Sequence, residues 1–86
     1  MSGTKHNYTA DNLAELNVLM LYDDSTSLEG IKIHKSADPS AITAANSLFE
    51  KGIITQADGG YLTSLGREVA EHTLALYTML NAHSDQ

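Results

Sequence analysis

The chain has 86 residues, 42% of them hydrophobic, which suits one small folded domain and argues against global disorder. It has no cysteine, which excludes disulfides, thiolate metal sites and thiol nucleophiles. The polar N-terminus has no signal-peptide pattern and the longest apolar run, Val18 to Leu21, is too short to span a membrane, so we expect a cytoplasmic protein. The formal net charge of −6 is unfavourable for a nucleic-acid-binding protein, but the acidic excess lies in residues 1–24 and 68–86, and residues 25–67 are neutral.

The N-terminal half predicts a flexible arm over residues 1–8 and then two helices. Thr9 is a suitable N-cap, and apolar residues at helical spacing predict a first helix from Ala10 to Tyr22. Residues 25–37 are ambiguous, because Ile31 and Ile33 alternate as in a strand whereas Leu28 and Ile31 fit a helix. With no evident strand partner, we favour a short helix over residues 27–35.

Asp38-Pro39 predicts the start of the next helix, since Asp is a preferred N-cap and Pro a preferred first helical residue. An apolar stripe follows, and Gly52 provides the positive φ that commonly ends a helix. We therefore expect a helix over residues 39–51, whose other face has mainly short polar side chains.

Residues 53–63 predict a two-stranded hairpin, with strands at about 53–56 and 61–63. Asp58-Gly59-Gly60 is a strong turn signal between them. Thr63 or Ser64 can cap a long helix that ends near Asn81, followed by a frayed tail at 82–86. The expected fold is α+β, mostly helical, in a single domain over residues 9–81.

The segment from Asp38 to Gly66 resembles the recognition helix and wing of winged-helix regulators. The matching positions are Leu48, Lys51-Gly52-Ile53-Ile54, Tyr61-Leu62-Thr63 and Gly66. The whole chain, including AELNVL at 14–19 and KGIITQADGGYLTSLGRE at 51–68, also resembles a small uncharacterised bacterial family whose members are mostly labelled as DNA-binding proteins. The resemblance implies a winged-helix (helix-turn-helix) fold and a role in transcription regulation.

The helix over 39–51 is the candidate recognition helix for double-stranded DNA. Asn pairs well with adenine, and Ser, Thr and Ala can contact base edges or a thymine methyl. The groove-facing candidates are Ser40, Thr43, Ala44, Asn46 and Ser47. Candidate phosphate contacts are Lys32, Lys35, Lys51 and Arg67, together with His34. Neither set excludes the simpler interpretation, a solvated helix face with ordinary surface charges, and the tip Asp58 argues against a DNA-reading wing.

The first and last helices have more apolar surface than one small domain needs, which indicates a partner. We expect a homodimer, with the interface formed by Leu16, Met20, Val69, Thr73, Leu74, Leu76, Tyr77 and Leu80. The simpler interpretation is that these two helices cover each other. The alternative function is an acidic winged-helix module that binds another protein and not DNA.

Nothing in the sequence indicates an enzyme, a cofactor or a metal. Glu68 and His72 share a helix face, but two ligands do not make a metal site. Gly59-Gly60 belongs to a hairpin and not to a phosphate-binding loop, and Ser47 and Ser64 have no evident base partner.

Overall fold

The chain folds into a small, mostly helical α+β domain, which confirms the predicted fold class. The computed structural model describes residues 6–23 and 29–82. The elements in order are α1 (Ala10–Leu19), β1 (Ile31–Lys32), α2 (Pro39–Glu50), β2 (Ile54–Gln56), β3 (Gly59–Leu62) and α3 (Ser64–Leu80). The outer parts of the predicted arm and tail, 1–5 and 83–86, lie outside the described residues.

All three helices begin at predicted capping residues. The Thr9 hydroxyl accepts a hydrogen bond from the Asn12 amide at 3.0 Å, and the Asn12 side chain accepts one from the Thr9 amide at 3.1 Å. Asp38 accepts from the Ser40 amide at 2.9 Å, and Thr63 caps α3 in the same way. These side chains satisfy amide groups that have no partner within the helix.

The first helix ends earlier than predicted, at Leu19 rather than at Tyr22. The amides of Leu21 and Tyr22 donate to the carbonyls of Val18 and Leu19, three residues back, so the chain leaves the α-helix in tight turns. The second helix ends at Glu50, with Lys51 as its C-cap and Gly52 at φ +78°, as its sequence indicated.

The predicted hairpin is confirmed by the antiparallel pairing of β2 with β3, and β1 joins it as a third strand that was not predicted, in the order β1-β3-β2. This third strand shows that the helix expected over 27–35 is wrong, since Ile31 pairs with Gly60 and Lys32 with Gly59; residues 27 and 28 lie outside the described part. Glycine permits this pairing, because a Cβ on Gly59 would lie 2.6 Å from the Ile31 carbonyl oxygen. The two glycines expected to form the turn are therefore strand residues, and the turn itself lies at Ala57-Asp58.

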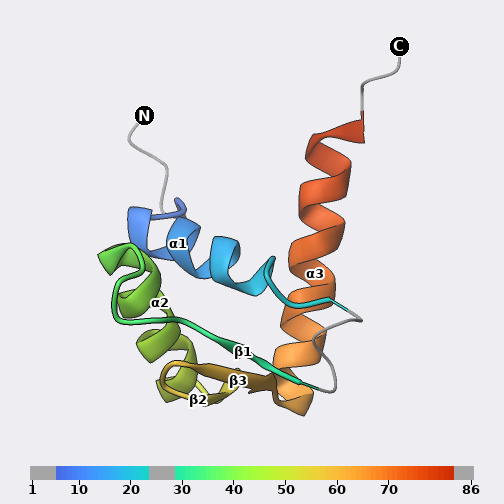
Figure 1. Cartoon of the computed structure of the whole chain (residues 1–86). Helices are drawn as coiled ribbons and strands as arrows, with labels where there is room; N and C mark the ends of the chain where they lie inside the picture. Colours follow the sequence, from blue (N-terminus) through green and yellow to red (C-terminus); the bar gives the residue numbers. More distant parts are fainter. Residues whose placement is uncertain (1–5, 24–28, 83–86) are drawn as a thin grey trace.

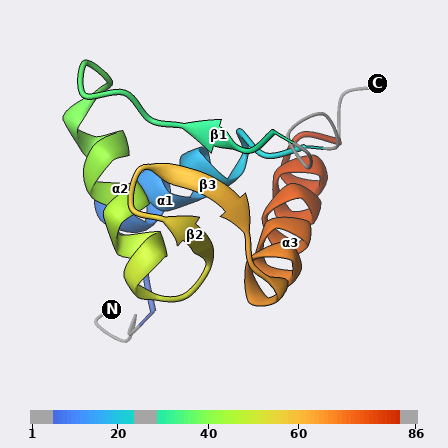
Figure 2. The same ribbon diagram turned by 60° about the horizontal axis from the view of Figure 1, so that its bottom comes forward.

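The sheet bridges α2 and the beginning of α3 (Figures 1 and 2). The beginning of α3 can lie close to the chain entering β2 because Gly66, which is buried there, has no side chain. A Cβ at Gly66 would overlap the backbone carbonyl of Ile53. From this contact α3 rises past the sheet and the end of α1, and only its last turns stand clear of the other described elements (Figure 1).

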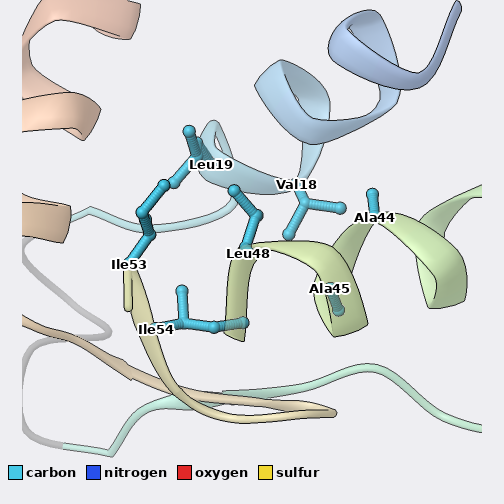
Figure 3. Packing of buried hydrophobic residues seen from close by; sticks show 7 residues of the cluster. All are labelled: Val18, Leu19, Ala44, Ala45, Leu48, Ile53 and Ile54. Atoms are coloured by element: carbon cyan, nitrogen blue, oxygen red, sulfur yellow. The ribbon is translucent and has the colours of Figure 1, made fainter. Parts of the chain in front are cut away.

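The core lies between α1, α2 and the start of β2 (Figure 3). Val18 and Leu19 come from α1, and Ile53 and Ile54 from the chain entering β2. The members from α2 are Ala44, Ala45 and Leu48. The side of α2 away from the core faces solvent, and its exposed residues are Pro39, Ser40, Thr43, Asn46, Phe49 and Glu50. No helix in the described residues is both long and apolar enough to cross a membrane.

Candidate nucleic-acid interface

The solvent-facing side of α2 contains Ser40, Thr43 and Asn46 from the predicted set, all exposed. Ala44 does not belong there: it is only 3% exposed and packs in the core, so its expected position on the groove-facing side is wrong. The periodicity of α2 did not separate Ala44 from its polar neighbours, because alanine suits either side of a helix.

Ser47 and Lys51 face α1, where both bind the carboxylate of Glu15. The Ser47 hydroxyl and the Lys51 ammonium each donate to Glu15 Oε2 at 2.7 Å, and the Asn12 amide donates to Oε1 at 3.2 Å. Glu15 is only 8% exposed, so these bonds compensate a buried charge. Two of the predicted DNA contacts are thus engaged within the chain.

Burial alone raises the pKa of the Glu15 carboxyl. The hydrogen bonds from Lys51, Ser47 and Asn12, together with the positive charge of Lys51, outweigh that effect and place the pKa below its ordinary value of 4.5. Glu15 therefore stays ionised at neutral pH and holds α1 against α2.

Sequence reasoning missed Glu15, although a signal for it was present. Glu15, Val18 and Leu19 have the i, i+3, i+4 spacing that places three side chains on one helix face. A lone carboxylate on an apolar face needs a cation nearby. Its partner, however, is 36 residues away, so only the tertiary structure identifies it as Lys51.

The exposed side of α2 borders a surface groove of about 920 Å³, here called the α2–β1 groove. It is lined by Lys32, Ile33, His34, Lys35, Ser36, Ile42, Ala45, Asn46, Ala57 and Asp58. Among the lining residues Ala45 is buried and Ile33 and Ile42 are half-buried, whereas Lys32, His34 and Lys35 are exposed. The fold thus brings three predicted phosphate contacts next to Asn46 of the candidate recognition helix.

The acidic tip of the hairpin is partly neutralised in this groove. The Lys32 ammonium lies 3.9 Å from the Asp58 carboxylate, and both side chains are about half exposed or more, at 67% and 48%. Such an exposed pair contributes little stability. It does offset the negative charge that argued against contact between this hairpin and a phosphate.

Arg67 is separated from the other predicted cations. It lines a second groove, of about 410 Å³, between the end of α1 and α3, with Leu19, Met20, Tyr22, Asp23, Leu62, Ala70, Glu71 and Leu74. The two grooves share no lining residue. Arg67 therefore does not join the group beside α2.

Tyr22 lies at the second groove with a buried hydroxyl that has no hydrogen-bond partner in the described part of the chain. Burial, together with the negative charge of Asp58, raises the pKa of Tyr22 to about 12. The hydroxyl is therefore neutral throughout the physiological range, and the ring acts mainly as packing.

The predicted dimer residues fall into three groups, which are buried, half-buried and exposed. Thr73 is only 6% exposed and donates to the Val69 carbonyl at 2.9 Å, so its expected place in an interface is wrong. Val69, Leu16, Met20 and Leu76 are half-buried within the chain. Leu74, Tyr77 and Leu80 are 55%, 55% and 71% exposed, and Met79, which was not predicted, is 76% exposed.

No group of three or more His, Asp or Glu side chains in residues 6–23 and 29–82 could hold a metal ion. His34 lies in the α2–β1 groove, and His72 is an exposed residue of α3.

The chain belongs to DUF5669, a family of unknown function, whose model matches residues 6–81. Neither the comparison with curated proteins nor that with solved structures finds a match. The resemblance to winged-helix regulators therefore stays a prediction based on the residues quoted above.

Proposed function

We propose that this member of a family of unknown function is a homodimeric DNA-binding protein of the transcription-regulator type. The observation that supports the proposal is that exposed Asn46 of α2 lines the α2–β1 groove together with Lys32, His34 and Lys35. Thr43, one turn earlier on α2, is also exposed. This arrangement offers one element for reading base edges and a neighbouring row of donors for the phosphate backbone. Such a role implies a cytoplasmic location.

Each part of this surface has a distinct task. Asn46 can donate and accept hydrogen bonds with one adenine edge, and Thr43 can contact a thymine methyl or a base edge. Lys35 and Lys32 would contact phosphates and fix the position of α2 on the duplex. Contacts of the first kind give sequence preference, whereas those of the second kind act on all sequences.

The arrangement of charge makes this role compatible with an acidic chain. The negative charge of buried Glu15 is paired with Lys51, and the Asp38 carboxylate accepts a hydrogen bond from the Ser40 amide at the start of α2.

The α2–β1 groove itself has few cations, so we expect that two protomers are needed for useful affinity for DNA. Lys32 lies beside Asp58, so Lys35 is the phosphate contact with no acidic neighbour in the groove lining. With about two to four lysines neutralising phosphates in a dimer, the logarithm of the binding constant should fall with a slope of about 2 to 4 against the logarithm of salt concentration.

The test is a titration of labelled duplex DNA with the full-length protein at several salt concentrations, followed by fluorescence anisotropy. We expect binding at low salt that weakens as salt rises, and Lys35→Ala should weaken binding to all sequences and reduce the salt slope by about 1 for each phosphate that is no longer neutralised. Arg67→Ala is the matched control, because it removes the same charge from the other groove. Asn46→Ala should instead change the preferred sequence, as measured by selection from a random duplex pool.

Two results would count against the proposal. One is the absence of binding at low salt by a folded protein. The other is an equal loss of affinity in Lys35→Ala and Arg67→Ala, because a general effect of charge does not depend on the α2–β1 groove.

A second candidate function is an interaction module that binds another protein and not DNA. It is favoured by the exposed apolar end of α3, where Leu74, Tyr77, Met79 and Leu80 are all more than half exposed. This candidate predicts that a defined protein partner protects these side chains while duplex DNA leaves them unaffected, as measured by hydrogen exchange and by tyrosine fluorescence.

A further inference from the structure

One line of side chains runs the whole length of α3. Gly66, Ala70, Thr73, Tyr77 and Leu80 alternate steps of four and three residues, which places them along one side of the helix. We call this line the α3 seam. Gly66 and Thr73 are buried by the chain itself and Ala70 is half-buried, so the body of the domain covers the first part of the seam.

The second part of the seam continues beyond the body of the domain. Tyr77 and Leu80 occupy the next two positions but are 55% and 71% exposed. In Figure 1 the corresponding upper part of α3 has no described helix or strand beside it. We call residues 74–82 the overhang. Leu74 still lines the second groove with Leu19 and Met20, and Leu76 is half-buried. Beyond them the seam continues through Tyr77 and Leu80, so the end of the overhang has the pattern of a helix that packs against something, with no covering element among the described residues.

The overhang has no charged side chain, and this favours a second copy of the chain as the partner that covers it. Residues 72–82 contain no Asp, Glu, Lys or Arg, although the chain as a whole has a net charge of −6. An acidic protein that pairs with itself must avoid placing like charges across the two-fold axis. An uncharged apolar helix end meets this requirement, and a second copy supplies an equally apolar surface.

We infer that the overhang of α3 pairs with the overhang of a second copy, antiparallel around a two-fold axis close to Tyr77. Tyr77 then packs against Tyr77 of the partner subunit, and Leu74 lies beside Leu80 of the partner subunit. This inference deepens the homodimer of the proposed function by naming its interface. It rests on that function only for the dimer's purpose, since the pairing stands or falls without DNA.

The test measures the molar mass of the full-length protein by light scattering over a range of micromolar concentrations. We expect twice the 9.3 kDa of one chain for the natural protein. Tyr77→Glu places two like charges at the axis, and it should raise the dissociation constant of the dimer by roughly 30-fold or more, as for a central interface residue. Leu65→Glu is the matched control: Leu65 is on the same helix and 49% exposed, but it is outside the seam, so this variant should remain dimeric.

A second measurement keeps the inference testable if Tyr77→Glu fails to fold. The chain has no cysteine, so Tyr77→Cys introduces a single thiol. Mild oxidation should link this variant into a covalent dimer, whereas Leu65→Cys should link far less.

A monomeric natural protein, or a dimer that Tyr77→Glu leaves intact, would overturn this interface. The same is true if Leu65→Glu dissociates the dimer as strongly as Tyr77→Glu does. The DNA titration is read separately: a dimer with this interface and no DNA binding removes the proposed function alone. A monomer that still binds DNA at low salt removes this interface and the dimer of the proposed function, and leaves DNA binding itself.

Discussion

Replacing Lys51 with methionine removes one partner of a buried carboxylate while it keeps most of the side-chain volume. Lys51 donates to Glu15 at 2.7 Å, and a hydrogen bond to a charged group contributes about 1.5–3 kcal/mol. Solvent screening lowers that value, because the Lys51 side chain is 51% exposed, whereas that of Glu15 is only 10% exposed. Glu15 also keeps its bonds from Ser47 and Asn12, so we expect Lys51→Met to reduce the free energy of unfolding by about 1–2 kcal/mol. The melting temperature of a domain of this size should fall by about 5–10 °C.

The pH dependence of stability provides an independent check on the sign. The pKa of Glu15 in the folded protein lies below its ordinary value of 4.5, so the folded state favours the ionised form. The stability that Glu15 contributes is therefore fully present above about pH 4.5 and is lost as the pH falls from there through the folded-state pKa. Glu15→Gln should remove this loss, and Lys51→Met should make it smaller.

Urea denaturation of the full-length variants at neutral pH and at pH 4 or below measures both effects, provided that the slope with urea stays constant. Lys35→Met is the control, because it removes the same charge from an exposed position and should change stability by less than about 0.5 kcal/mol. If Lys51→Met is as mild as Lys35→Met, or if its acid sensitivity equals that of the natural protein, Lys51 does not stabilise Glu15.

Five further substitutions test three features of the fold, each measured by thermal or urea denaturation. Gly66→Ala should lower the free energy of unfolding by more than about 2 kcal/mol, because a Cβ there overlaps the Ile53 carbonyl. Gly52→Ala should lower it by only about 1 kcal/mol, because Gly52 has a positive φ but open space around it. Equal losses of stability in the two variants would contradict the close contact at Gly66. Tyr22→Phe should leave stability unchanged or slightly raised, because the buried hydroxyl has no hydrogen-bond partner in the described residues. In an absorbance titration, the variant should lack the tyrosine whose pKa burial raises to about 12. A clear loss of stability would reveal a hydrogen bond at the Tyr22 hydroxyl. Thr63→Ala should lower the free energy of unfolding by about 1–2 kcal/mol, because the N-cap of α3 is lost. Thr63→Ser keeps the hydroxyl and should retain most of that stability. If Thr63→Ser is as destabilising as Thr63→Ala, the methyl group and not the hydroxyl is what matters.

The candidate site was predictable only in part. Asn46 and Thr43 could be placed on one side of a helix from their spacing alone, and the structure keeps them exposed. Ala44 could not be separated from them, because its burial depends on how closely α1 approaches. Arg67 follows the hairpin in the chain, but the direction of α3 places it in a different groove from Lys35. The DNA-binding role stays a prediction.

The sequence by itself determined the helix starts and the reversal between β2 and β3. Thr9, Asp38 and Thr63 act on amides two or three residues away, so their effect is local and does not depend on the rest of the fold. Tertiary structure alone decided that residues 31–32 form a strand, since that strand exists through pairing with Gly59 and Gly60 far along the chain. The same holds for the partner of Glu15 and for the uncovered end of α3. In each case the deciding energy comes from a contact between distant segments, which local sequence patterns do not record.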